Sequence, residues 1–317
     1  MKLRFRREHG LLLLFLVVFL GLALSVPQFA GRDNLLLVLR FHAPMAVLAT
    51  GMTLVILTGG IDLSIGSIVA LSAVVLGLVW KGTGSGPLAL AAAAGTGALC
   101  GFINGALVSW GRVPPLIVTL ATLSVFRGAA YAVGGSDTFN GFPAWMLSKN
   151  WYQFLSLPPD LWLIALLFLG TGLYLAKTSG GRAIYAVGHN EQAARLSGVP
   201  VRLLKLRLYT VMGLLAGLAA ILYAGYFESV RANVGGGYEL IAITMVVLGG
   251  TSVSGGEGSM AGTALGFLTL ILIQNGMELG GHRWNLPTEA HGVVVAILLI
   301  SALLLDAGFR RRALSRV

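Results

Sequence analysis

Long apolar segments separated by short polar or glycine-rich breaks run through this chain from end to end. A helix needs about 20 apolar residues to cross the hydrocarbon core of a bilayer, and several of these segments reach or approach that length. The pattern predicts about ten membrane-spanning helices, the eighth of which is short enough to be broken or re-entrant. The predicted spans are Leu11–Val26, Leu35–Leu57, Ile61–Val79, Leu88–Trp110, Leu116–Val133, Leu161–Ala176, Leu208–Gly225, Leu240–Gly250, Met260–Leu279 and Gly292–Leu305.

Composition supports the same class. The 317 residues are 56% hydrophobic and only 11% charged, with a mean hydropathy of +0.84. A soluble domain carries about 25% charged residues, so lipid must be the main solvent of this chain. The 44 glycines fit a membrane bundle, where small residues let helices pack closely. We therefore predict an all-α, polytopic membrane helix bundle that occupies residues 1–317 as a single domain.

Positive charge indicates the orientation of the bundle. With ten spans and the N-terminus inside, most of the 22 Lys and Arg residues fall in cytoplasmic segments, as the positive-inside rule requires. Both termini and the loop 178–206 are then expected in the cytoplasm, and Gly134–Asp160 outside. The net charge of +10 follows from these short clusters beside the spans, so we do not expect a nucleic-acid partner.

The stretch Thr178–Pro200 is a polar, glycine-punctuated loop in an otherwise apolar protein. It contains a short helix-forming run in which Glu191 and Arg195, four residues apart, can pair along one face. The two alanines between them, including Ala194, offer a small face for close docking. We expect this loop to bind a soluble partner on the cytoplasmic side.

Two glycine-rich breaks, Thr58–Ser67 and Leu248–Ser259, interrupt the apolar pattern at membrane depth. Each contains a Gly-Gly pair, which permits backbone angles closed to other residues. Broken helices are tolerated in membranes where they line a cavity or are buried in protein. In one interpretation Asp62 simply caps the helix that follows the first break. In the other, the break lies beside a transport pathway and moves with it.

Asn-Gly pairs recur in the fourth and ninth predicted spans, at Asn104 and Asn275. They suggest that spans two to five and seven to ten are related halves in inverted orientation, with chance similarity as the rival explanation. Arg127 lies inside the fifth span, where it either faces a polar cavity or snorkels toward the outer surface. The candidate pathway or hinge residues are Gly59, Gly60, Asp62, Ser64, Asn104, Arg127, Gly249, Gly250 and Asn275.

Nothing in the sequence predicts a catalytic centre or a metal site. There is one cysteine, Cys100, and the histidines do not follow the spacing of metal ligands. No Ser/His/Asp set or carboxylate pair is recognisable either. The sequence therefore favours a membrane transporter over an intramembrane enzyme.

Five segments, taken in order, resemble the ribose-type sugar permeases of ATP-binding cassette importers. They are Thr58–Ser67, Gly97–Val108, Pro115–Gly128, Gly181–Gly198 and Gly249–Gly262. The resemblance covers the chain from about residue 34 to Asp306. It implies a cobalamin-importer-like fold of ten spans in the bacterial inner membrane, paired with a second permease copy or a paralogue. It also implies a cytoplasmic ATPase that holds ATP and Mg, a periplasmic sugar-binding protein, and no cofactor on this chain.

In such permeases the loop matching Asn190–Gly198 holds a coupling helix that sits in a groove of the ATPase. The coupling residues implied by the resemblance are Gly181, Arg182, Gly188, Asn190, Glu191, Ala193, Ala194, Arg195, Ser197 and Gly198. His189 is a departure, because relatives often carry a small residue there. The implied cargo is a monosaccharide, with rhamnose or an autoinducer-2-like molecule preferred.

The alternative is an ATP-independent secondary transporter or channel for a small polar solute. It predicts an ionisable coupling residue deep in the bundle, for which Arg127 is the candidate.

Overall fold

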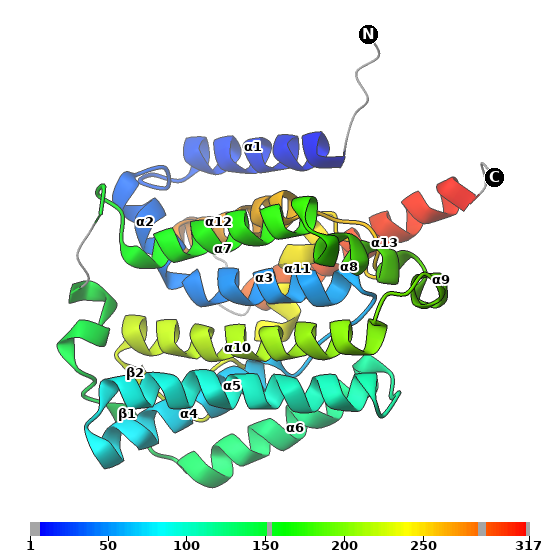
Figure 1. Cartoon of the computed structure of the whole chain (residues 1–317). Helices are drawn as coiled ribbons and strands as arrows, with labels where there is room; N and C mark the ends of the chain where they lie inside the picture. The colour runs from blue at the N-terminus through cyan, green and yellow to red at the C-terminus, as the bar shows by residue number, and fades with distance from the viewer. Residues whose placement is uncertain (1–6, 151–153, 285–289, 315–317) are drawn as a thin grey trace.

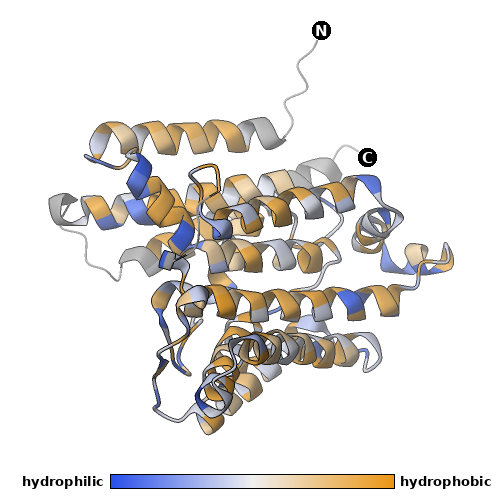
Figure 2. Ribbon diagram, turned by 60° about the vertical axis from the view of Figure 1, so that its left-hand side comes forward, coloured by the Kyte–Doolittle hydropathy of each residue, from blue (hydrophilic) through white to orange (hydrophobic). Residues whose placement is uncertain are grey.

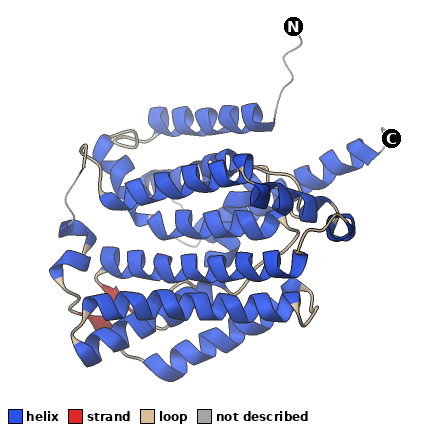
Figure 3. Cartoon of the chain, in the orientation of Figure 1, coloured by secondary structure: helices blue, strands red, loops and turns tan. Residues whose placement is uncertain are grey.

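The computed structural model describes residues 7–150, 154–284 and 290–314, and nearly all of this part is helical (Figure 1, Figure 3). The helices are α1 Arg7–Ser25, α2 Arg32–Phe41, α3 Ala43–Leu57, α4 Ile65–Thr83, α5 Gly86–Ser109, α6 Pro115–Gly134, α7 Pro159–Lys177, α8 Ser179–His189, α9 Glu191–Leu196, α10 Val201–Phe227, α11 Tyr238–Leu248, α12 Met260–Trp284 and α13 Ala290–Leu314, with the short 3-10 turns η1 Ala144–Met146 and η2 Ser148–Asn150. Two short strands, β1 Phe139–Asn140 and β2 Ser229–Val230, pair antiparallel.

Each of the ten predicted apolar segments contains a helix, but the helices differ in length, and the third begins only at Ile65. Six are long and apolar enough to cross a membrane: α4, α5, α6, α7, α10 and α12. The second predicted span is the pair α2 and α3, bent by 55°, which makes a seventh if the pair is one span. The described apolar parts of α1, α11 and α13 are shorter. The prediction of an all-helical membrane protein is confirmed, with six or seven candidate spans among the described residues.

Most residues along the helices are hydrophobic, and the hydrophilic ones lie mainly at helix ends and in loops (Figure 2). On the outside, large apolar side chains such as Ile117, Leu166 and Val293 are more than half exposed. In water such a surface would aggregate, whereas in a bilayer it meets acyl chains. This distribution is what a membrane location requires.

Glycines bring α5 and α10 into the most extensive helix contact of the bundle. On α5, Gly97, Gly101 and Gly105 recur every four residues. The first two face Gly213 or Gly217 of α10, and Gly105 faces Leu206 and Tyr209 of the same helix. A Cβ added to Gly101 would overlap the Tyr209 carbonyl oxygen, and one added to Gly213 would overlap the carbonyl oxygen of Gly97. Small residues at this spacing let the two backbones touch, which is how membrane helices associate without a hydrophobic driving force.

The two ends of the bundle carry different structures (Figure 1). One end holds the β1–β2 ladder and the turns η1 and η2. The opposite end holds α8 and α9, and α1 begins and α13 ends there as well. The described parts of the segments predicted to be cytoplasmic are thus at one end, and the described parts of Gly134–Asp160 are at the other.

Candidate coupling site

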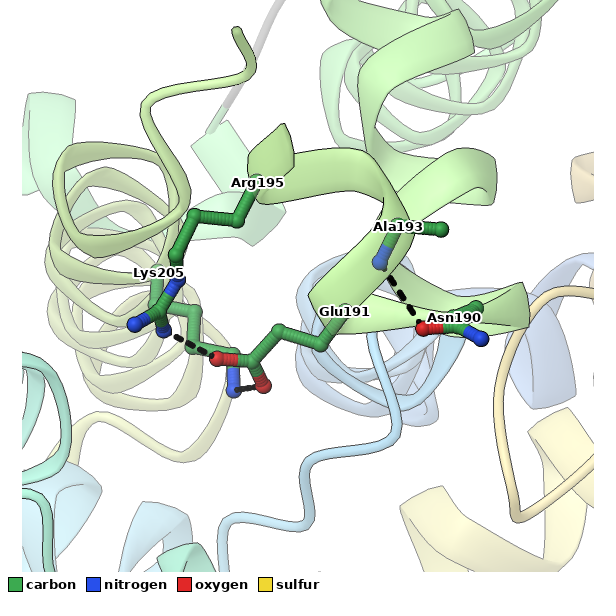
Figure 4. Close-up of polar contacts among 5 residues, drawn as sticks. All are labelled: Asn190, Glu191, Ala193, Arg195 and Lys205. Atoms are coloured by element: carbon green, nitrogen blue, oxygen red, sulfur yellow. Dashed lines mark hydrogen bonds and ion pairs between the residues drawn. The ribbon is translucent and has the colours of Figure 1, made fainter. Parts of the chain in front are cut away.

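The segment predicted as a polar loop contains two helices, α8 and α9. The Thr178 side chain begins α8, because its Oγ1 accepts a hydrogen bond of 3.0 Å from the Gly181 amide. The Asn190 side chain begins α9, accepting from the Ala193 amide at 2.9 Å (Figure 4). Both are N-caps of the ordinary kind. Gly198, with φ +85°, closes the last turn of α9 in a left-handed conformation that favours glycine.

Glu191 pairs with two cations, Arg195 within α9 and Lys205 of α10, and the second pair ties the two helices together (Figure 4). Its carboxylate accepts from Arg195 at 2.9 Å, which confirms the predicted pair, and from Lys205 of α10 at 2.6 Å. Partial burial raises the pKa of Glu191, but Lys205 and Arg195 together outweigh it, so the pKa is lowered overall. The carboxylate is therefore ionised at neutral pH. Sequence spacing missed Lys205 because the contact joins two helices across a turn.

Ala194 faces inward, so the expectation that it forms a docking face is wrong. It is 5% exposed and packs with Val187 of α8 and Val201 of α10 in a small apolar cluster. This cluster and the Glu191 pairs seat α9 on the bundle. The outward side of α9 instead presents Leu196, which is 87% exposed. An apolar side chain that far into solvent, beside polar neighbours, is a candidate contact for a partner.

Helix α8 lies directly on the second glycine-rich break. Tyr185 Oη donates to the carbonyl oxygen of Gly258 at 2.9 Å. A Cβ added to Gly188 would overlap both the Leu57 carbonyl oxygen, at the end of α3, and the amide of Gly256. The His189 ring lies beside Gly256, so the residue that departs from the family pattern contacts this break.

The two breaks also contact each other. The Gly256 amide donates to the Leu57 carbonyl oxygen at 2.9 Å. A Cβ on Gly59 would lie 3.2 Å from the Ser254 carbonyl oxygen, and one on Gly255 would lie 2.6 Å from the amide of Gly59. Segments almost 200 residues apart in sequence therefore share one junction with α8. Sequence reasoning found both breaks separately and did not predict that they meet.

In each Gly-Gly pair one glycine is required by its backbone angle and the other by the lack of space for a side chain. Gly59 and Gly250 have φ values of +76° and +82°, a region that L side chains adopt at a cost. The other two glycines, Gly60 and Gly249, have no room for a side chain. A Cβ on Gly60 would lie 2.7 Å from the Tyr209 hydroxyl, and one on Gly249 would overlap the Gly262 carbonyl oxygen. The expectation of glycine-only backbone angles is confirmed for one member of each pair.

Three predicted pathway residues form a fully buried hydrogen-bonded cluster. Asp62 Oδ1 accepts from the Ser64 amide at 2.9 Å and from Ser64 Oγ at 2.6 Å, and Ser64 Oγ accepts from Asn104 Nδ2 at 2.7 Å. Helix α4 begins at Ile65 after Ser64, so Asp62 orders the preceding turn rather than capping the helix, contrary to the capping interpretation. Asp62 Oδ2, Asn104 Oδ1 and the nearby Tyr209 hydroxyl have no hydrogen-bond partner among the described residues.

The sequence reasoning missed Tyr209. Its position four residues before Gly213, in the same stripe as Gly217, was a usable signal, because that stripe is the face of α10 that packs on α5.

Arg127 and Asn275 lie outside this cluster. Arg127 Nη1 donates to the backbone oxygens of Ala232 and Val234, at 3.0 and 2.6 Å, and so fastens α6 to the segment before α11. Its guanidinium thus has backbone partners within the protein. Asn275 of α12 forms a reciprocal amide pair with Asn34 of α2, at 2.9 and 3.2 Å.

The remaining coupling candidates lie at the turn into α8 or on the surface of the same end of the bundle. Gly181 lies at the turn from α7 into α8, where a Cβ would overlap the Leu175 carbonyl oxygen. Arg182, Ala193 and Ser197 are exposed at this end of the bundle. Within the described ranges, no group of three or more His, Cys, Asp or Glu residues is arranged to hold a metal ion.

Comparison with known proteins identifies the family of this chain. Residues 34–303 match the family described as branched-chain amino acid transport system / permease component. The ribose import permease protein RbsC of Escherichia coli (strain K12) is 37% identical over 303 residues, which cover 94% of this chain and 93% of the relative. The autoinducer 2 import system permease protein LsrD of the same organism and strain is 32% identical over 306 residues, covering 95% and 93%. No solved structure matches significantly.

Proposed function

Because the chain belongs to the branched-chain amino acid transport system / permease component family, we propose that it is the transmembrane permease subunit of an ATP-binding cassette importer that carries a monosaccharide across the inner membrane. In this proposal the bundle has ten spans, with α2–α3 as one broken span and α1, α11 and α13 completing the count. The fold is cobalamin-importer-like, with two inverted halves.

The observation that carries the proposal is the continuous contact from α9 to both glycine-rich breaks. Helix α9 is seated on α10 by Glu191, Lys205 and the apolar cluster around Ala194. Helix α8 precedes it and touches Leu57 and Gly256. A displacement of α9 would therefore move α8, and through its contacts the backbone at the ends of α3 and α11, where the spans turn.

The mechanism follows from these contacts. A cytoplasmic ATPase, which holds ATP and Mg, closes on ATP binding and moves α9 and α8 together. The breaks then pivot, and the bundle switches between outward-facing and inward-facing states. The permease itself binds no cofactor and performs no catalysis. Because a periplasmic binding protein delivers the sugar, the pathway needs no strong site of its own.

Location and assembly complete the proposal. The chain is a multi-pass protein of the bacterial inner membrane with both termini and the α9 end in the cytoplasm. It pairs with a second permease copy or a paralogue, so that two coupling helices meet the two ATPase domains.

The substrate class rests on the relatives. The names of RbsC and LsrD assign ribose and autoinducer 2 to those proteins. Ribose and an autoinducer-2-like molecule are accordingly the first cargoes to test here, with rhamnose third.

The test is uptake by the complete complex in proteoliposomes, with the ATPase inside and the binding protein outside. We expect one labelled sugar to be taken up, and only when ATP and the binding protein are both present. Unlabelled sugars should compete with its uptake only if they are its close analogues. ATP-dependent uptake of a branched-chain amino acid instead of any sugar would overturn the substrate class.

The rival function is transport without ATP. It requires an ionisable residue that changes charge in the pathway. Arg127 is bonded to two backbone oxygens, whereas Asp62 is a fully buried carboxyl with one oxygen unpartnered among the described residues, so Asp62 is the residue to test for this rival. Equal uptake with and without ATP in the same vesicles would establish this rival.

A further inference from the structure

A cavity of about 380 Å³ opens beside α9, bounded by the end of α5, the α5–α6 turn and the first turns of α10. Its polar lining includes Ser109 of α5, Arg112 of the turn, Arg195 of α9, and Arg202 and Lys205 of α10. The proposed coupling uses Glu191, Lys205 and Val201 of this lining to seat α9, and it gives no role to Ser109, Arg112 and Arg202.

The cavity carries an excess of positive charge. Four cations line it and Glu191 is the single acid in the lining. That carboxylate is already shared by Arg195 and Lys205. Among the residues the structure describes, Arg112 and Arg202 form no ion pair. Two cations that share one cavity and repel each other favour an anion between them.

Ser109 adds a neutral donor at the same place. Its side chain is buried, with the residue 5% exposed, and its Oγ has no hydrogen-bond partner in the described chain. A buried hydroxyl without a partner costs free energy that a ligand oxygen can recover. Together with two guanidinium groups, the hydroxyl provides the donor set that a phosphate group accepts from.

The neighbouring surface is apolar. Trp110 follows α5, and Leu116 and Ile117 stand in the first turn of α6, all at least half exposed. Tryptophan is enriched where the acyl region of a bilayer meets its head groups. The cavity thus lies at the boundary between a charged surface and a face that must meet acyl chains.

We propose that this cavity binds the phosphate of an anionic phospholipid, with the acyl chains lying over Trp110, Leu116 and Ile117. The proposal rests on the membrane placement in the proposed function and does not depend on the sugar carried. Basic pockets between membrane helices on the cytoplasmic side are suited to such head groups. A bound lipid there would fill the gap behind α9 and hold it at a fixed height above the membrane.

Lipid binding can be measured on the full chain in detergent by native mass spectrometry, titrating phosphatidylglycerol and phosphatidylcholine separately. We expect the wild-type chain to bind one phosphatidylglycerol at least about tenfold more tightly than phosphatidylcholine, since each nearby cation contributes about as much as a several-fold change in affinity. The double variant Arg112→Gln/Arg202→Gln should remove this preference. The matched control Lys177→Gln/Arg207→Gln removes two exposed charges from the same end and should keep it, because neither residue lines the cavity.

Inorganic phosphate and purified ATPase serve as further probes. Displacement of phosphatidylglycerol by millimolar inorganic phosphate would assign the site to free phosphate rather than lipid. If the cavity variant bound phosphatidylglycerol like wild type but lost the ATPase, the cavity would belong to the docking surface and the lipid proposal would fail. Neither readout requires sugar uptake, so a failure here is distinguishable from a failure of the proposed function.

Discussion

At the scale of single residues, Gly249 and Gly250 are required for different reasons. Gly250 has a backbone angle that favours glycine, and Gly249 has no room for a side chain. In Gly250→Ala the new Cβ makes only an ordinary van der Waals contact with Leu11 at 3.4 Å, but the left-handed φ costs about 1 kcal/mol. In Gly249→Ala the Cβ overlaps the backbone of α12, where overpacking costs roughly 1–3 kcal/mol. We expect Gly250→Ala to fold and insert but transport slowly, and Gly249→Ala to lose abundance.

Protein level, ATPase activity and uptake measured on both variants check this pair of expectations. Wild-type uptake by Gly250→Ala at wild-type abundance would show that the break does not pivot through this residue. Wild-type abundance of Gly249→Ala would show that α11 and α12 can shift apart to accommodate the new methyl group without destabilising the protein.

Leu196 gives a second prediction at this scale. Because its side chain is exposed on the outer side of α9, Leu196→Glu should leave the bundle intact and weaken ATPase binding by at least about tenfold, as loss of a buried apolar contact at an interface does. Co-purification of the ATPase with the variant measures this. Gln192→Glu, which adds the same charge to an exposed residue of the same helix, is the control and should retain the ATPase.

Glu191 predicts a pH dependence. Its folded pKa lies below the ordinary 4.5, so its contribution to seating α9 is complete above pH 4.5 and is lost as the pH falls through the folded value. A spin label at residue 192, on a Cys100→Ala background, should become more mobile in that acidic range. The same label in Glu191→Gln should be mobile at neutral pH and insensitive to acid; equal mobility in both proteins at pH 7 would contradict the role of the ion pairs.

At the scale of elements, the α5–α10 interface depends on glycine. Gly101→Ala places a methyl group against the Tyr209 carbonyl oxygen, whereas Gly95→Ala on the same helix meets nothing within 4 Å. Helix propensity favours alanine by up to about 1 kcal/mol at both sites. We expect Gly95→Ala to be neutral or stabilising and Gly101→Ala to be destabilising by roughly 1–3 kcal/mol. Thermal unfolding in the same detergent compares the two variants. Equal melting temperatures would show that α5 and α10 can move apart to accommodate the methyl group without losing stability.

At the scale of the whole molecule, the arrangement of ends predicts the topology. Asp137 lies at the β1–β2 end and Ser197 at the α9 end, and both are exposed. On a Cys100→Ala background, Asp137→Cys should react with an impermeant thiol reagent added outside intact cells, and Ser197→Cys only after permeabilisation. The opposite result would invert the orientation and place α9 where no ATPase could reach it.

The sequence by itself determined the class of protein, the apolar helices and the position of the polar segment that contains α8 and α9. These follow from local properties: apolar length, charge asymmetry, and side chains such as Asn190 that begin a helix within three residues of themselves. The i, i+4 pair of Glu191 and Arg195 was predictable for the same reason.

Only the tertiary structure decided which of these pieces meet. That Ala194 faces inward depends on Val187 and Val201, and that Glu191 also binds Lys205 depends on how α10 starts. The junction of Gly59, Gly188 and Gly256 joins three segments far apart in the chain. Contacts of this kind are set by the packing of whole helices, which no single stretch of sequence encodes, so periodicity could locate the breaks but not bring them together.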